Sequence, residues 1–209
     1  MNQRRAARAR RLAARYPVSR EPLLFYAELM DLPPGLEPLR SFVAAKGPAL
    51  LAEFARALST AEPPLEDPAS PAGFFARVMR QQRGEFTPPA QAAPNLCPHC
   101  GNPPQAGCLR PEGDGTALSL VCSLCGNEWP FPRGHCPGCD SDKLAFYAAE
   151  GFDHIQVQAC DACRRYLHLI NLAKDPEAIP EVDELAALPL DVWAREQGYV
   201  KLYPNLAGI

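Results

Sequence analysis

The sequence lacks several features that define whole classes of protein. No apolar run approaches the roughly 18 residues of a membrane helix, which excludes an integral membrane protein. No charge of one sign dominates, because 21 basic and 24 acidic residues give a formal net charge of −3, so global charge does not indicate nucleic-acid binding. A secretory signal, a phosphate-binding glycine loop, a Ser/His/Asp set and paired carboxylates are also missing. We therefore expect a cytoplasmic protein that is not an enzyme.

Cysteine is absent from the first 96 residues, and proline interrupts that front part instead. The chain has 24 prolines in 209 residues, more than twice the usual share of about 5%, which excludes one helical bundle over the whole length. Apolar residues at helical spacing predict a small helical domain over residues 1–84, followed by a Pro/Ala linker over 85–95. The expected helices cover residues 4–15, 21–30, 38–58 with a break at Gly47-Pro48, and 71–83 after Ser70.

All nine cysteines lie between Cys97 and Cys163, and eight of them form four C-x-x-C pairs. Successive pairs are separated by 21, 10 and 20 residues, and the third pair repeats the first 39 residues later. Two thiolates in one tight turn chelate one ion, so two such turns around a hairpin supply the four ligands of a tetrahedral site. The predicted ligand sets are Cys97, Cys100, Cys122 and Cys125, and then Cys136, Cys139, Cys160 and Cys163.

Two alternatives to these serial sites remain. In a cross-brace, alternate pairs share a metal, but the internal repeat argues against it. Disulfides are the other alternative, and without a signal peptide we expect the thiols to stay reduced. The expected cofactors are therefore two metal ions, and four thiolates suit zinc and rubredoxin-type iron equally well.

The inserts within each half predict two β-hairpins. Their strands are expected at residues 105–110 and 116–121, then 144–149 and 155–159, with third strands at 128–131 and 165–170. Gly101 and Gly126 follow the second cysteine of their pairs, where a positive φ is often needed. Asp140 and Arg164 stand at these places in the second half, so less regular turns are expected there.

The other candidate side chains are weaker. Cys108 is interpreted as a small buried apolar residue rather than a reactive thiol. His99 and His135 lie within or beside a cysteine pair and are expected to be exposed or to support the ligands. His154 and His168 have no constellation around them in the sequence.

Charge is unevenly distributed: residues 1–20 carry +7 and residues 95–209 carry −7. Arg4, Arg8, Arg11 and Arg15 share one helical stripe, which is interpreted first as a solvated face. Docking to an acidic partner is the main alternative, and nucleic acid is a lesser one. At the other end, residues 179–199 predict an amphipathic helix, bent at Pro189 and packed on the ribbons.

The second half carries a further ordered series of motifs: residues 122–129, Arg133, the pair Cys136-Pro-Gly-Cys139, Lys143, the pair Cys160-Asp-Ala-Cys163, Tyr166-Leu167, residues 174–176, residues 181–191 and residues 196–199. The resemblance carried by this series is to the formate dehydrogenase accessory protein FdhE family. It implies a helical domain followed by two rubredoxin-like ribbons, with the eight paired cysteines as ligands of iron or zinc. It also implies a cytoplasmic maturation factor that binds the catalytic subunit of a molybdenum- or tungsten-containing formate dehydrogenase and promotes its active state.

The expected fold class is α+β, with a helical N-terminal domain, two tandem rubredoxin-like (zinc-ribbon) modules and a C-terminal helix. The expected boundaries are 1–84, 85–95, 96–134 and 135–174 for the two ribbons, and 175–209 for the helix and tail. A rubredoxin-like electron-transfer protein is the alternative function, and a zinc-ribbon nucleic-acid binder is less favoured. The sequence indicates no nucleic-acid partner and no membrane span, and it leaves the oligomeric state open.

Overall fold

The front of the chain folds as helices separated at proline, in the places that the sequence predicts. In the computed structural model, which describes residues 2–59, 61–63, 67, 70–84 and 86–205, these are α1 Asn2–Arg15, η1 Pro17–Ser19, α2 Arg20–Asp31, α3 Leu36–Lys46, α4 Ala49–Ala57 and α5 Pro71–Arg83. Gly47-Pro48 separates α3 from α4, and the hydroxyl of Ser70 caps α5 by accepting a hydrogen bond from Gly73 N at 3.0 Å.

The second half forms one seven-stranded sheet. Its strands are β1 Pro104–Glu112, β2 Gly115–Cys122, β3 Glu128–Pro130, β4 Leu144–Ala148, β5 Ile155–Cys160, β6 Arg165–Asn171 and β7 Val200–Lys201. Both predicted hairpins and both third strands are present. The order is β3-β2-β1-β6-β5-β4, with β7 paired to β6.

The two ribbons are not separate tandem modules, which corrects the sequence-based expectation. Strand β1 of the first ribbon pairs in parallel with β6 of the second, from Ala106 opposite His168 to Leu109 opposite Asn171. Both strands are buried over most of their length, as parallel neighbours in a sheet usually are. Gly107 leaves room for the side chains at this junction, because a Cβ there would lie 2.5 Å from the end of the Leu169 side chain, which would have to move. The α+β class is confirmed, with the ribbons fused rather than tandem.

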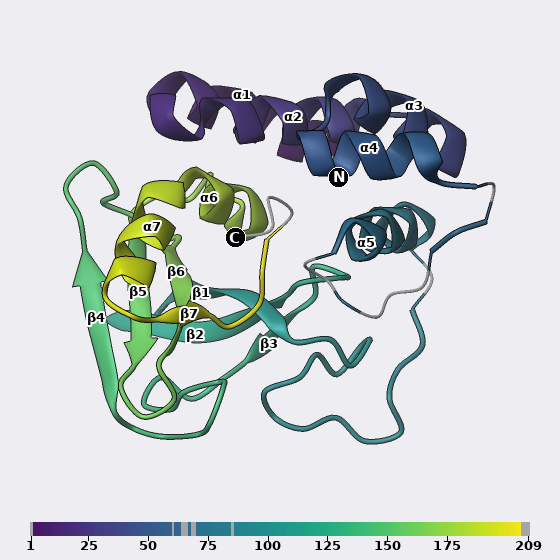
Figure 1. Cartoon of the computed structure of the whole chain (residues 1–209). Coiled ribbons are helices and arrows are strands. Elements are labelled where there is room, and N and C mark those ends of the chain that lie inside the picture. The colour runs from purple at the N-terminus through teal and green to yellow at the C-terminus, as the bar shows by residue number, and fades with distance from the viewer. Residues whose placement is uncertain (1, 60, 64–66, 68–69, 85, 206–209) are drawn as a thin grey trace.

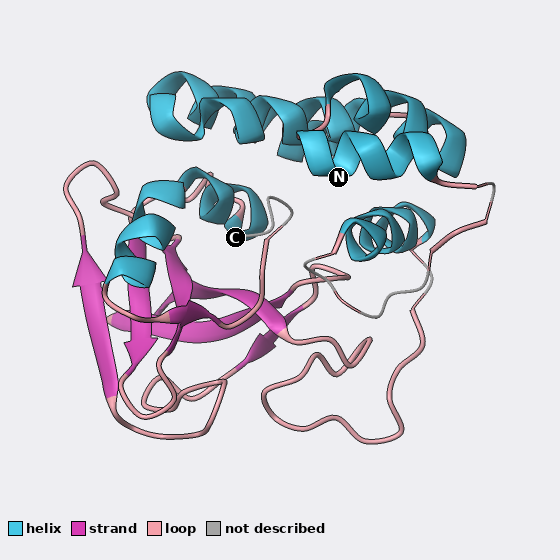
Figure 2. Cartoon of the chain, in the orientation of Figure 1, coloured by secondary structure: helices cyan, strands magenta, loops and turns pink. Residues whose placement is uncertain are grey.

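The predicted C-terminal helix is two short helices, α6 Pro180–Ala186 and α7 Leu188–Glu196, which meet at Ala187. Pro189 lies in the first turn of α7, where its missing N–H costs no helical hydrogen bond. Figure 1 shows α6 and α7 between the sheet and the upper layer of α1–α4, and Figure 2 shows the same layers by secondary structure. Helix α6 adds Val182, Leu185 and Ala186 to the core of the helical layer.

Residues 86–95 of the expected linker form no helix or strand, and Glu85 lies outside the described residues. The segment is held against the first ribbon, since Trp129 Nε1 donates to the Pro94 carbonyl at 3.0 Å. None of the helices in the described part of the chain combines the length and apolar character needed to cross a membrane.

Candidate metal centres

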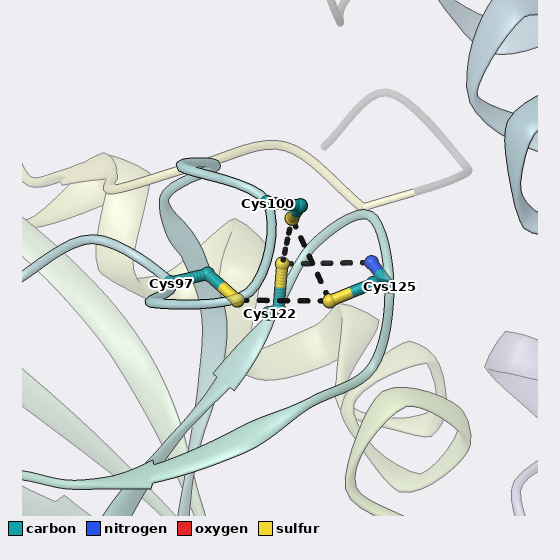
Figure 3. A group of neighbouring side chains, drawn as sticks. All are labelled: Cys97, Cys100, Cys122 and Cys125. Carbon is teal, nitrogen blue, oxygen red and sulfur yellow. Dashed lines mark hydrogen bonds between the residues drawn. The ribbon is translucent and has the colours of Figure 1, made fainter. Parts of the chain in front are cut away.

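The first cysteine cluster gathers Cys97, Cys100, Cys122 and Cys125, with the four thiols pointing toward one another (Figure 3). The Sγ–Sγ distances are 3.6 Å for Cys97–Cys125, 3.4 Å for Cys100–Cys122 and 3.5 Å for Cys100–Cys125. One pair of ligands precedes β1 and the other ends β2, so the hairpin itself brings the four together.

The second cluster gathers Cys136, Cys139, Cys160 and Cys163 in the same way. Its Sγ–Sγ distances are 3.7 Å for both Cys136–Cys163 and Cys139–Cys160. One pair precedes β4, and the other begins with Cys160 at the end of β5. The structure thus gathers the two serial sets, and neither cluster mixes cysteines from both halves as a cross-brace requires.

Both clusters fit a zinc or iron ion. Four sulfurs at about 2.3 Å from a central ion form a tetrahedron whose edges are about 3.8 Å, close to the distances above. All nine cysteines are free thiols, so no disulfide competes. Backbone N–H groups also point at the sulfurs: His99 N lies 3.4 Å from Cys97 Sγ, and Gly138 N lies 3.3 Å from Cys136 Sγ. Such donors stabilise the negative charge of the thiolates. An ion bound in either cluster would be held by four sulfurs with no open coordination position.

All four turns share one backbone geometry, so the expectation of less regular turns in the second half is wrong. Asp140 and Arg164 have φ of 62° and 57°, close to the 73° and 71° of Gly101 and Gly126. In each turn the N–H of this residue donates to the carbonyl of the first cysteine, as from Asp140 N to Cys136 O at 2.8 Å. The turn therefore imposes the left-handed conformation on whatever residue stands there.

The first cluster lies under the helical layer. Arg77 of α5 is fully buried and donates to the carbonyl of Ser123, between Cys122 and Cys125, at 3.4 Å. The same guanidinium also donates to the Pro204 carbonyl at 3.2 Å and to the Asn205 carbonyl at 3.4 Å. Burial lowers the pKa of Arg77, and Tyr203, Glu184 and Cys122 partly offset this effect. A second arginine, Arg5 of α1, lies beside Gly126 while it pairs with Glu181.

The second cluster lies at the open end of its ribbon. Cys139 is exposed and Cys163 is half-buried, whereas no cysteine of the first cluster is fully exposed. Burial alone would raise the pKa of the Cys160 thiol, but N–H groups of Cys163 and Ala162 outweigh it and lower that pKa to about 7. Support comes from the linker, because Asn95 Nδ2 donates to the Pro137 carbonyl at 2.9 Å.

The remaining cysteine and two of the histidines behave as the sequence predicts. Cys108 is fully buried, and burial raises the pKa of its thiol to about 12. His135 is exposed beside Asp140, and His99 packs edge-on against Phe86. Among the described residues, neither histidine joins a cysteine cluster.

His154 and His168 do stand in constellations, which corrects the sequence interpretation. His154 Nε2 lies 2.8 Å from Asp183 Oδ1, and the guanidinium of Arg8 reaches both Asp183 and Asp175. All but Asp175 are buried, and this first ion cluster joins α1 to α6 and to the turn before β5.

The second ion cluster lies between the sheet and the helices α6 and α7. Lys201 pairs with Glu184 and, at 2.9 Å, with Asp191, while His168 lies 3.6 Å and 3.4 Å from the same two carboxylates. Gln105 and the Tyr166 hydroxyl donate to Glu184 and Asp191. Paired carboxylates are thus present: Arg8 compensates Asp183 and Asp175, and Lys201 is shared by Glu184 and Asp191. The available signal was the Asp183-Glu184 pair within the otherwise apolar residues 182–190, but its basic partners Arg8 and Lys201 lie farther away in the sequence.

The N-terminal arginine stripe is not simply a solvated face. Arg8 is buried in the first ion cluster, and Arg11 and Arg15 lie 3.3 Å from Glu177 and 3.9 Å from Asp153. The acidic surface that these arginines contact belongs to the second half of the same chain. Arg8 therefore helps to hold the two halves together, whereas the exposed pairs of Arg11 and Arg15 add little.

Two family models match the second half of the chain, together covering more than half of its length. The model described as "FdhE, central domain" matches residues 96–133, and "FdhE, C-terminal domain" matches residues 135–207. The first contains the first cysteine cluster, and the second contains the other cluster with α6 and α7.

Curated relatives share the same region. Each of three is described as "Protein FdhE homolog": from Aquifex aeolicus, 35% identical over 118 residues (54% of this chain and 42% of the relative); from Pseudomonas aeruginosa, 38% over 119 (53% and 38%); and from Stutzerimonas stutzeri, 41% over 114 (53% and 37%). The chain thus spans about two fifths of the length of these relatives.

A solved structure extends the likeness to the helical half. The crystal structure of the FdhE protein from Pseudomonas aeruginosa superposes with a TM-score of 0.72 and 23% identity, covering 98% of this chain and 94% of that one. At this identity the likeness concerns the fold.

Proposed function

The chain belongs to the FdhE family, and from this premise we propose that it is an accessory factor for a molybdenum- or tungsten-dependent formate dehydrogenase. In this role it binds the catalytic subunit in the cytoplasm and promotes its active state without catalysing a reaction itself. One observation carries the proposal: the family match runs through both cysteine clusters and through the α6–α7 segment that ties them to the helices.

The chemistry of the molecule is compatible with this role. Its buried carboxylates already contact Arg8, Lys201, His154 and His168. Its metal clusters each offer four thiolates, which leaves no open coordination position for a substrate. The two metal sites would therefore stabilise the fold, and a rigid fold of this kind suits binding a partner rather than catalysing a reaction.

The test is co-purification with the catalytic subunit of formate dehydrogenase from the same organism, together with deletion of the gene. We expect a complex and a loss of formate dehydrogenase activity that the intact gene restores. Normal activity in the deletion strain, with no complex, would refute the proposal.

Electron transfer is the second candidate, favoured by the exposure of Cys139 in the second cluster. Iron held there by four thiolates would lie close to a partner's redox centre. Anaerobically purified protein that is colourless, redox-silent and filled with zinc eliminates this function.

A further inference from the structure

The two ends of the sheet are protected to different degrees. β3 forms one end, and it is three residues long, contains Pro130, and carries Glu128 in an ion pair with Arg110 at 2.7 Å. Short length, proline and charge are the usual means by which a protein prevents an edge strand from pairing with another chain. The β3 edge is therefore closed to further strands.

The other end, β4, carries none of these protections. Its five residues, Leu144 to Ala148, include no charge and no proline, and within the described residues β4 pairs only with β5. Figure 1 shows β4 as the outermost strand of the sheet. Phe146 in its centre is 54% exposed, which is unusual for so large an apolar side chain. An edge of this kind is a template for an added strand.

A cleft of about 130 Å³ opens beside Phe146, on the face of the sheet opposite α7. Leu109, Leu118 and Arg133 of the first ribbon line one wall, and Phe146, Gln156, Gln158 and Leu169 of the second line the other. Gln158 is buried, yet its Oε1 accepts no hydrogen bond from any described residue. A buried acceptor without a donor is costly, so Gln158 favours an N–H or O–H donor at its end of the cleft rather than a second acceptor.

The charged groups near the cleft indicate the chemistry of what it binds. Arg133 is exposed, donates only to the Thr116 carbonyl at 3.0 Å, and has no acidic partner among the described residues. Lys143, at the start of β4, is also exposed. The acids Asp142 and Glu150 lie beyond the two ends of the strand and do not line the cleft. The cleft therefore favours a carboxylate beside an apolar group.

We propose that the β4 edge is the docking site for an extended segment of the partner protein. The segment pairs its backbone with β4, sets an apolar side chain against Phe146 at the mouth of the cleft, and places a carboxylate against Arg133. Only an extended chain satisfies the backbone groups of a strand edge, and only an apolar residue with a neighbouring acid matches the cleft. This inference rests on the proposed function, which makes the partner the catalytic subunit of formate dehydrogenase.

The experiment compares the full metal-loaded chain with variants at the edge, using the purified catalytic subunit as the probe. Phe146→Lys is expected to weaken binding about tenfold or more, the scale of losing an aromatic anchor. Arg133→Glu weakens binding, and Arg133→Lys retains most of it. In hydrogen exchange, residues 144–148 gain protection in the complex.

Val18→Lys is the matched control, since Val18 is 76% exposed on η1, away from the sheet, and receives the same charge. It is expected to bind as the unmodified chain does. Two metals per chain and an unchanged unfolding temperature in every variant exclude misfolding as the cause.

Three outcomes overturn the inference. If Phe146→Lys and Arg133→Glu bind normally, or protection appears elsewhere while the complex forms, the β4 site is wrong and the proposed function stands. If the unmodified chain forms no complex, both are wrong. If β4 becomes protected in the chain alone as it dimerises, the occupant is a second copy and not a partner segment.

Discussion

The two ribbons carry the same metal-binding turns in different surroundings. The cluster of the first ribbon lies beneath α5. Arg77 of that helix donates to the carbonyl of Ser123, which stands between Cys122 and Cys125 in the sequence, and Arg5 lies beside Gly126. The second has Cys139 exposed and presents the unprotected edge of β4. Sequence spacing determines that four thiols meet, whereas the neighbouring helices determine whether the cluster is covered or exposed. The first ribbon is thus an internal joint, and the second faces outward.

The largest expected effect separates the two clusters directly. Cys122→Ser and Cys160→Ser change the corresponding ligand of each ribbon, and each should reduce the metal content from two ions to one. Since zinc binding to such sites contributes about 10–16 kcal/mol to folding, each ribbon should unfold locally. Only Cys122→Ser should also release α5, because Arg77 loses the Ser123 carbonyl.

Metal analysis and hydrogen exchange measure these two effects. Rapid exchange over residues 71–83 is expected in Cys122→Ser and not in Cys160→Ser. Equal exchange of α5 in the two variants would contradict the assignment of the first ribbon as the joint.

Substituting Glu184 should destabilise both ribbons to a similar degree. It accepts from Gln105 of β1 at 3.0 Å and lies 3.6 Å from His168 of β6, so it bridges them. Burial alone would raise the pKa of Glu184, but Lys201 and His168 outweigh burial and lower that pKa. Glu184→Gln removes one of the two carboxylates that hold buried Lys201 and leaves Asp191 as its partner, so it should cost about 3 kcal/mol at neutral pH, the lower end for a broken buried pair.

The pH dependence of this difference follows from the lowered pKa. A carboxyl with a lowered folded-state pKa stabilises the fold above its unfolded value of about 4.3, and the stabilisation is lost as pH falls below it. The unfolding free energies of the unmodified chain and of Glu184→Gln should therefore converge as the pH falls. Acid also releases the metals, but this affects both proteins equally and does not change the difference between them. A difference that stays constant from pH 7 to pH 3 would exclude this role.

Arg77→Ala tests the joint without touching a metal ligand. Three carbonyls lose their charged donor, and we expect a loss of about 2–3 kcal/mol in the free energy of unfolding. A chelator should then remove metal faster from the first cluster alone. Arg80→Ala, on the exposed face of the same helix, is the control and should leave both clusters unchanged.

The smallest expected effect concerns the turns. A Cβ at Gly101, where φ is 73°, would meet Pro89 at 3.7 Å, an ordinary van der Waals contact, so Gly101→Ala should cost about 1 kcal/mol from backbone strain alone. Asp140→Gly in the second ribbon relieves the same strain and should be neutral to slightly stabilising. Denaturant unfolding of the metal-loaded chains measures both, and a stabilising Gly101→Ala would show that the turns differ after all.

Local patterns account for what could be predicted. Ser70 and the Gly47-Pro48 break located helix ends because capping and the missing proline N–H act within a few residues. The interpretation of His154 and His168 was wrong because Asp183 and Glu184 approach them only after α6 packs between sheet and helices. The fused sheet was missed for a related reason, since a parallel junction leaves no turn signal in the sequence.

By itself, the sequence determined the two cysteine sets, the two hairpins and the helices of the front part, because each depends on spacing within a short segment, and the order of the cysteine pairs and the motifs after them indicated the family. The tertiary structure alone decided that the ribbons share one sheet, that the arginine stripe binds the chain's own acids, and that one cluster is covered while the other is open. Those outcomes depend on contacts between segments that are distant in the sequence. These contacts bury one copy of a motif and leave the other copy exposed, and a buried charge needs a partner.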